Sequence, residues 1–198
     1  MSNDDVCVIV PVYNEALTVA TTVSDLLASF DHVVCVDDGS TDGSAALAHE
    51  AGATVLRHVL NRGQGAALRT GFDHVLRHTS AAYAVTFDAD GQHLVDDARR
   101  MVERARTEDV DVVLASRFTG STQEIPRLRK LILLMAVRFT RLTSHLDVTD
   151  THNGLRVLSR RAMGDASRRW RGRCGRCWCR PASWRSVLLR VASAWDWP

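Results

Sequence analysis

Residues 83–93 read YAVTFDADGQH, and this stretch decides what fold the rest of the chain must form. An apolar run from Tyr83 to Phe87 leads directly into two carboxylates, Asp88 and Asp90, and Gly91 then turns the chain. In an open α/β sheet, ligands bind beyond the carboxyl ends of the strands. The pattern therefore predicts a strand that delivers both aspartates to the rim of a sheet.

Two carboxylates at this spacing can share one divalent cation, and Gln92 can add a neutral oxygen. Mg²⁺ is usually held by one or two carboxylates together with the phosphates of its substrate. The alternative is a loop in which the aspartates only cap the next helix. A single D-x-D motif does not separate these interpretations, so the rest of the chain has to decide.

The composition indicates an ordinary globular domain, because 24% of the 198 residues are charged and 45% are hydrophobic. A net charge of +2 gives no reason to expect a nucleic-acid partner. Cys7 and Cys35 lie in strand-like runs and are expected to be buried thiols. Residues 2–5 are polar and acidic, unlike a signal peptide, and no apolar run approaches the roughly 20 residues of a spanning helix. We expect a cytoplasmic protein.

Apolar runs that suit buried strands alternate with segments of helical periodicity along the first 116 residues. Strands are expected at 6–13, 32–36, 53–59, 83–87 and 110–116, and helices at 16–30, 43–51, 94–106 and from the glycine-rich turn 61–69 to about 78. This alternation predicts an α/β fold: an open, mostly parallel (mixed), twisted sheet with helices on both faces.

Three polar clusters fall at expected strand ends: Asn14/Glu15, Asp37/Asp38 and Asp88/Asp90. If the strands are parallel, all three meet at one rim. Such a concentration of carboxylates is costly unless a cation or a donor-rich ligand sits there. The glycine-rich turn is neither a P-loop nor a full dinucleotide motif, so it fits a tight helix start as well as it fits phosphate contact.

The motifs VIVPVYNE, VVCVDDGSTDGS, NRGQGAALRTGF, VTFDADGQH and ASRF occur in this order. Together they resemble family-two glycosyltransferases with the A-type nucleotide-sugar fold, and among these the polyprenyl-phosphate sugar synthases, such as the dolichyl-phosphate mannose synthases. The resemblance covers about residues 6–158. It implies an inverting, metal-dependent transfer of a sugar from a nucleotide-diphosphate donor to an acceptor.

The resemblance also implies roles for individual residues. The nucleotide site would contain Pro11, Tyr13, Glu15, Asp37, Asp38 and Gln64, and the Mg²⁺ or Mn²⁺ site Asp88, Asp90 and Gln92. Many relatives carry a lysine where Gln64 stands, so a charge contact is not carried over to this position. Tyr13 can alternatively be a packing residue, and Asp37 and Asp38 can cap a helix. Arg117 would approach the diphosphate or an acceptor phosphate.

The segment 127–144, RLRKLILLMAVRFTRLTS, has a short apolar centre flanked by basic residues. This pattern is typical of a helix in a membrane interface with its basic groups near lipid phosphates. It also fits a core-packing helix whose arginines reach solvent. The resemblance places the segment on the acceptor side, which favours a lipid-phosphate acceptor and peripheral attachment to the inner face of the membrane.

Residues 147–156, DVTDTHNGLR, resemble an acceptor-side element of the same synthases. Asp150 would serve as the general base if the acceptor is a hydroxyl. Arg156 would hold the anion if the acceptor is a phosphate. Both possibilities remain open in the sequence.

The expected organisation is a catalytic domain at 1–163, comprising a nucleotide-sugar half (1–118) and acceptor-side elements (119–163), followed by an atypical tail at 164–198. All five tryptophans lie after residue 169, and Cys174, Cys177 and Cys179 crowd among arginines without an obvious fourth zinc ligand. We interpret the tail as an aberrant or truncated ending that contributes little to the nucleotide site and that can impair the enzyme.

Two other functions remain as alternatives. A nucleotidyltransferase also pairs such a fold with two aspartates, but it usually has a glycine- and lysine/arginine-rich loop after the first strand, where residues 11–15 read PVYNE. A receiver-like signalling domain requires a lysine at the end of the fifth strand, where Ser116 and Arg117 stand.

Overall fold

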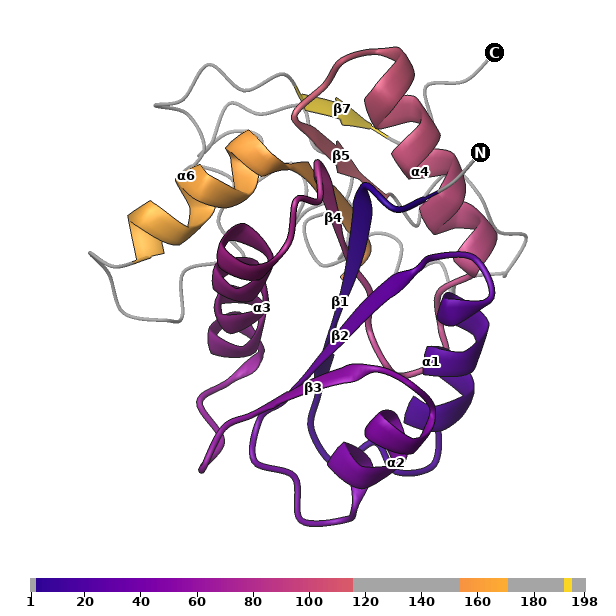
Figure 1. Ribbon diagram of the computed structural model, residues 1–198, viewed down its shortest axis with the longest axis vertical. Helices are drawn as coiled ribbons and strands as arrows, with labels where there is room; N and C mark the ends of the chain where they lie inside the picture. Colours follow the sequence, from indigo (N-terminus) through magenta and orange to yellow (C-terminus); the bar gives the residue numbers. More distant parts are fainter. Residues whose placement is uncertain (1–2, 116–153, 171–190, 194–198) are drawn as a thin grey trace, which may run out of the picture.

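The computed structural model describes residues 3–115, 154–170 and 191–193 (Figure 1). Within these ranges, seven strands form one sheet in the order β3-β2-β1-β4-β6-β5-β7. The strands are β1 Val6–Val12, β2 His32–Asp37, β3 Thr54–Arg57, β4 Tyr83–Thr86, β5 Val112–Leu114, β6 Arg156–Ser159 and β7 Val191–Ser193. The helices are α1 Val19–Leu27, α2 Ser44–Glu50, α3 Gln64–His78, α4 Val95–Thr107 and α6 Arg160–Trp170.

Strand β1 lies between β2 and β4 and pairs with both in parallel. Its sequence VCVIVPV is apolar throughout because both of its faces are covered by helices. Val12 pairs with Asp37, and Ile9 pairs with Thr86. The residues that follow β1, β2 and β4 therefore emerge at the same edge of the sheet, as predicted.

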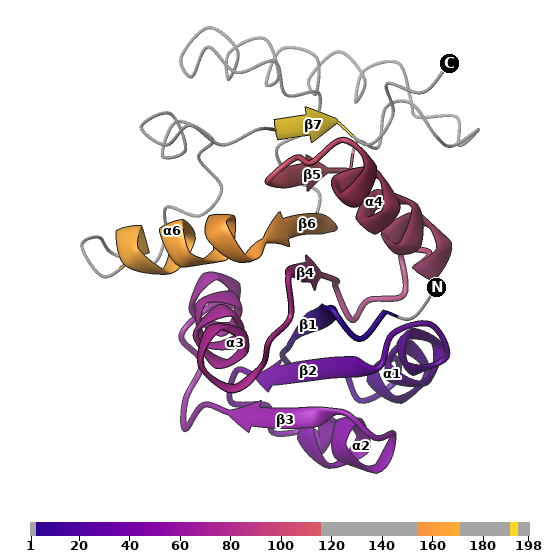
Figure 2. The same cartoon turned by 45° about the horizontal axis from the view of Figure 1, so that its top comes forward.

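Helices cover both faces of the sheet. Successive side chains of a strand point to opposite sides, so alternate residues of one strand pack against different helices. Val8 and Val10 belong to a buried cluster with residues of α1 and α4, whereas Cys7 and Ile9 belong to a second cluster with residues of α3 and α6. Figure 2 shows α1, α2 and α4 on one side of the sheet and α3 and α6 on the other. The predicted two-sided architecture is confirmed.

Both cysteines of this core are free and buried, as expected from their positions in apolar runs. Burial raises the pKa of the Cys7 thiol and of the Cys35 thiol to about 12. Both thiols are therefore protonated at neutral pH and act as small apolar side chains rather than as nucleophiles.

Strand β6 is antiparallel and lies between β4 and β5. The sequence predicts no strand there, because RVLS is short and its partners are far away in the chain. The run of parallel strands from β3 to β4 is interrupted by this strand, and β5 pairs with β7 in parallel beyond it, so the expected mixed sheet is confirmed. The insertion also brings Gly154, just before β6, against the carboxylate of Asp88.

Helix α6 continues through Gly164, where the tail was expected to begin, and it buries Met163, Ala166 and Ser167. Strand β7 pairs with β5 in parallel. The amino-acid composition changes at Gly164, but helix α6 does not end there. The remainder of the tail lies outside the described residues, so the boundary and the interpretation of the ending stay predictions.

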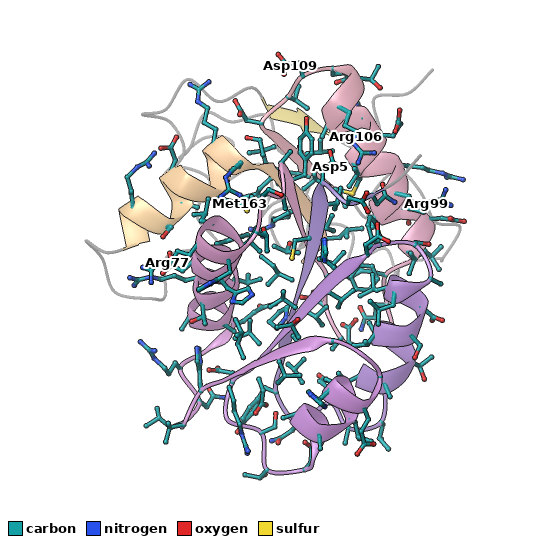
Figure 3. All side chains as sticks on the ribbon, viewed as in Figure 1. Asp5, Arg77, Arg99, Arg106, Asp109 and Met163 are labelled. Carbon is teal, nitrogen blue, oxygen red and sulfur yellow. The ribbon has the colours of Figure 1, made fainter. Side chains whose placement is uncertain are left out.

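The edge opposite the carboxyl ends of β1 and β4 carries an ion pair between the residues before β1 and α4. Figure 3 shows Arg106 beside Asp5, and the two side chains form an ion pair. Burial, reinforced by the charge of Asp109, raises the pKa of Tyr83 at this edge.

In the parts of the chain that the structure describes, no helix has the length and apolarity needed to cross a membrane. The segment 127–144 lies outside those parts.

Candidate functional site

A pocket of about 390 Å³ opens where β1, β2 and β4 end. Its lining comes from four separate stretches of the chain: the end of β1, the end of β2, the glycine-rich turn with the start of α3, and the end of β4. The lining residues are Pro11, Val12, Tyr13, Glu15, Asp38, Asn61, Gly63, Gln64, Ala67, Asp88, Ala89 and Asp90. The three polar clusters of the sequence thus meet in one place.

Most of the predicted site residues that the structure describes belong to this pocket. The residues it brings together are Pro11, Tyr13, Glu15, Asp38, Gln64, Asp88 and Asp90. Asp37, Gln92 and Arg156 are described but are not among the lining residues. Arg117 and Asp150 lie outside the described residues, so their roles stay predictions.

Asp37 is fully buried and supports the turn after β2 instead of facing the pocket. Its Oδ1 accepts a hydrogen bond from the backbone N–H of Ser40 at 3.0 Å, and its Oδ2 lies 3.1 Å from Nε of Arg57. Consecutive side chains near the end of a strand point in opposite directions. Asp38 therefore faces the pocket while Asp37 turns away from it.

Asp38 fixes the glycine-rich turn. Its carboxylate accepts hydrogen bonds from the backbone N–H groups of Arg62, at 3.0 and 3.1 Å, and of Gly63, at 2.6 Å. Nδ1 of His58 lies 2.6 Å from Oδ1. The turn is held tightly just before α3 begins, and Gly63 adopts a φ of 89°, which favours glycine.

The loop after β1 is bonded to the loop after β2 by reciprocal hydrogen bonds that the sequence analysis did not foresee. These bonds run from Asn14 N to Ser40 Oγ (3.0 Å), from Thr41 N to Asn14 Oδ1 (3.0 Å), from Glu15 N to Ser44 Oγ (2.8 Å) and from Ala16 N to Asp42 Oδ2 (3.0 Å). They hold Tyr13 and Glu15 at the wall of the pocket. The sequence signal that could have predicted these bonds is the presence of short polar side chains in both loops, since such residues form hydrogen bonds with nearby backbone groups.

Asp42 should make this loop contact sensitive to acid. The hydroxyl of Ser44, followed by the N–H groups of Ala16 and Ser44, lowers the pKa of Asp42 from its ordinary 3.8 and outweighs the desolvation that would raise it. A depressed pKa in the folded state means that the contribution to stability is complete above the ordinary value and is lost as the pH falls through the folded value. We expect Asp42→Asn to be less stable than the unchanged protein in urea unfolding at pH 7 and the difference to shrink toward pH 3. A difference that stays constant with pH would contradict this role.

Asp88 is enclosed on three sides. Its Oδ1 accepts a hydrogen bond from Nε2 of Gln64 at 2.9 Å, and Nε2 of His93 lies 3.5 Å from its Oδ2. Gly154 touches the same carboxylate so closely that a Cβ on this glycine would lie 1.8 Å from Oδ2. Thr86 fixes that approach by donating a hydrogen bond of 2.6 Å to the carbonyl of Gly154. The position of this carboxylate is therefore set by α3, by the loop before α4 and by the start of β6.

Asp90 is exposed, and its Oδ1 accepts a hydrogen bond from the backbone N–H of Gln92 at 3.0 Å. The side chain of Gln92 is exposed and does not reach the pocket. Among the described residues, Asp88 and Asp90 are thus the members of the expected metal set that face the pocket.

The charges of the pocket fit a divalent cation that is shared with a substrate. Among the described residues, the lining contains four carboxylates, Glu15, Asp38, Asp88 and Asp90, and no lysine or arginine. The described part of the chain has no group of three or more His, Cys, Asp or Glu that could hold a metal alone. Two carboxylates with room for phosphate oxygens are what Mg²⁺ or Mn²⁺ takes in such sites.

Comparison with known proteins identifies the family of the chain. The sequence profile of Glycosyl transferase family 2 matches residues 7–165. The chain is 33% identical over 162 residues to an uncharacterized protein of Methanocaldococcus jannaschii, covering 80% of this chain and 66% of that protein. It is 28% identical over 190 residues to the polyprenol monophosphomannose synthase of Mycolicibacterium smegmatis, covering 91% of this chain and 71% of that protein. The chain thus spans about two-thirds of the length of these curated relatives.

Among solved structures, glucosyl-3-phosphoglycerate synthase of Mycobacterium tuberculosis, with Mn²⁺, UDP-glucose and phosphoglyceric acid, superposes with a TM-score of 0.61. The sequence identity is 20%, over 95% of this chain and 68% of that one. This likeness confirms the A-type nucleotide-sugar fold expected from the sequence. The profile spans the three strand ends, the glycine-rich turn and Gly154, which touches Asp88, and it sets aside the nucleotidyltransferase and receiver-like alternatives: the chain belongs to glycosyl transferase family 2.

Proposed function

We propose that the protein transfers a sugar, with inversion, from a nucleoside-diphosphate sugar to an acceptor and that the reaction requires a divalent cation. The observation that carries this proposal is the acidic pocket at the ends of β1, β2 and β4. A diphosphate cannot lie against four carboxylates without a positive charge between them. Asp88 and Asp90 would hold Mg²⁺ or Mn²⁺, while Tyr13, Glu15 and the end of β1 would receive the nucleoside.

In this reaction the bond between the anomeric carbon of the sugar and the diphosphate oxygen breaks, and the leaving nucleoside diphosphate keeps the electron pair. The acceptor oxygen forms the new bond from the opposite face of the sugar, so the configuration inverts. A bound divalent ion would stabilise the charge that develops on the leaving group. The chain itself supplies the carboxylate of Asp88, whose orientation is fixed by contacts with Gln64 and Gly154.

We further propose a polyprenyl phosphate as the acceptor. A phosphate is already ionised at neutral pH, so it needs an anion-binding group more than it needs a general base. Arg156, the residue expected to hold such an anion, starts β6 two positions after Gly154, which touches Asp88, and it pairs with Thr86 at the end of β4. The likeness to a polyprenol monophosphomannose synthase supports the same acceptor class.

A binding panel tests the donor proposal. Thermal unfolding would be recorded with UDP-, GDP- and dTDP-sugars, each with Mn²⁺, with Mg²⁺ and with EDTA. Because a ligand that binds only the folded state stabilises it in proportion to RT ln(1 + [L]/Kd), we expect at least one nucleotide sugar to raise Tm in the presence of the cation only. Equal shifts in EDTA would remove the metal requirement, and no shift with any donor would overturn the function.

The expected attachment to the membrane has a separate test. The protein should co-sediment with vesicles that contain phosphatidylglycerol, and it should be released as the salt concentration rises, because charge attraction is screened. Replacing Arg129 and Lys130 by glutamine should weaken this binding. Binding that is equal on neutral phosphatidylcholine vesicles and indifferent to salt would favour the core-packing interpretation of residues 127–144.

A further inference from the structure

The side chain of His58 joins three elements of the fold. It follows β3 directly, its side chain is 8% exposed, and both of its ring nitrogens have partners. Nδ1 lies 2.6 Å from Oδ1 of Asp38, after β2, and Nε2 lies 2.9 Å from Oγ1 of Thr70, in α3. The sequence alone indicates no role for His58, because nothing local shows that Thr70, twelve positions later, contacts the same ring.

Hydrogen-bond chemistry fixes how the neutral ring must be arranged. The carboxylate of Asp38 acts as an acceptor, since the backbone N–H groups of Arg62 and Gly63 donate to it. Nδ1 of His58 must therefore carry a hydrogen and donate to Asp38. Nε2 of the neutral ring is then an acceptor, which the hydroxyl of Thr70 can satisfy as donor.

The same carboxylate controls the start of α3. Gly63 precedes the helix, and its N–H group donates to Asp38 at 2.6 Å. Gln64, the first residue of α3, donates to Asp88 at 2.9 Å. A continuous series of hydrogen bonds and one peptide unit therefore links the buried His58 to the carboxylate that faces the proposed metal.

We propose that His58 is a positioning residue of the candidate nucleotide site: its Nδ1–H orients Asp38, and Asp38 in turn fixes the turn from Arg62 to Gln64. Calling the pocket a nucleotide site rests on the proposed function, whereas the positioning of the turn does not. His58 does not line the pocket itself. Its effect on binding should come entirely through the groups that it holds.

Two substitutions separate positioning from packing. In His58→Asn the side-chain nitrogen falls near the position of Nδ1, so a donor to Asp38 remains while the contact with Thr70 is lost. In His58→Gln the nitrogen falls near Nε2, so the reach toward Thr70 remains while the donor to Asp38 is lost. Asparagine is the smaller residue and leaves the larger void, so packing alone predicts that His58→Asn is the more damaging change. Positioning predicts the reverse.

The first measurement is amide hydrogen exchange at Arg62 and Gly63 without nucleotide. We expect exchange to be about tenfold faster in His58→Gln and within about threefold of the unchanged protein in His58→Asn, since a lost bond to a charged group costs more than one between neutral groups. A second pair gives a control at the other ring nitrogen. Thr70→Val loses the contact that His58→Asn loses and leaves the Nδ1–H donor to Asp38, so exchange should stay within about threefold of the unchanged protein, as it should in Thr70→Ser, which keeps the hydroxyl. If a His58 variant does not fold, exchange about tenfold faster in Thr70→Val than in Thr70→Ser would overturn the inference.

The second measurement is the affinity for UDP with Mn²⁺, which should follow the same order as the exchange rates. If UDP and Mn²⁺ do not bind to the unchanged protein, the choice of donor or the proposed function fails, and the exchange data still judge the positioning role. Equal exchange rates in the two His58 variants, or faster exchange in His58→Asn, would overturn the inference.

Discussion

Replacing Asp90 by asparagine should weaken the binding of a nucleoside diphosphate in Mn²⁺ by about 100-fold, because Asp90 would be one of the two pocket carboxylates that hold the cation. Asp90 is exposed, and asparagine can still accept the hydrogen bond from the N–H of Gln92. The substitution therefore removes charge and little else. Unfolding free energy should change by no more than about 0.5 kcal/mol. Calorimetric titration with UDP or GDP measures the effect.

The matched control is Asp96→Asn. Asp96 is an exposed carboxylate near the start of α4 that pairs with Arg99 at 3.3 Å, outside the pocket. Its loss changes the protein charge by the same amount and should leave nucleotide binding unaltered. In EDTA, Asp90→Asn and the unchanged protein should bind equally weakly. An Asp90→Asn protein that retains full cation-dependent affinity would sink the proposed metal site.

Gly154→Ala should damage both stability and binding. Its new Cβ would lie 1.8 Å from Oδ2 of Asp88 and 2.3 Å from Cγ, which no small adjustment relieves. Either the carboxylate leaves its position or the start of β6 moves away from β4. Forcing extra volume into a packed site costs about 1–3 kcal/mol. A displaced Asp88 would also leave the pocket lining that it shares with Asp90. We expect a lower midpoint in urea unfolding and at least about a tenfold loss of cation-dependent nucleotide affinity.

Gly164→Ala provides the comparison within the same region of the chain. Gly164 lies inside α6, and the nearest atom to an added Cβ is the terminal nitrogen of Arg168 at 3.4 Å. Alanine favours a helix interior over glycine by roughly 1 kcal/mol, so this variant should be as stable as the unchanged protein or more stable. Comparable losses in the two variants would show that the contact with Asp88 is not the cause.

The strands and helices up to residue 115 were predictable because their signal is local. An apolar run such as VCVIVPV can bury all of its side chains only as a strand between two layers of helices. The polar clusters after β1, β2 and β4 could be predicted to lie at one edge of the sheet, because these strands are parallel. Which of two neighbouring aspartates faces the pocket did not follow, because it depends on how Asp37 and Asp38 leave the end of β2.

Two further features could not be predicted, because they depend on contacts between distant residues. The role of His58 requires Asp38 and Thr70, which come from other elements. Strand β6 has four residues and takes its place only by pairing with both β4 and β5. Short segments of this kind carry too little periodicity to be recognised before their partners are known.

The antiparallel strand β6 has a consequence for the order in which the molecule can assemble. During synthesis, β4 and β5 emerge first, but they cannot become neighbours of a continuous sheet until β6 enters between them. The hydrogen bond from Thr86 to Gly154 joins residues 68 positions apart, and closing so long a loop costs entropy before the contact offers any return. Pairings of such separation slow the folding of a domain. The surroundings of the Asp88 carboxylate are therefore complete only after Gly154 has reached the end of β4.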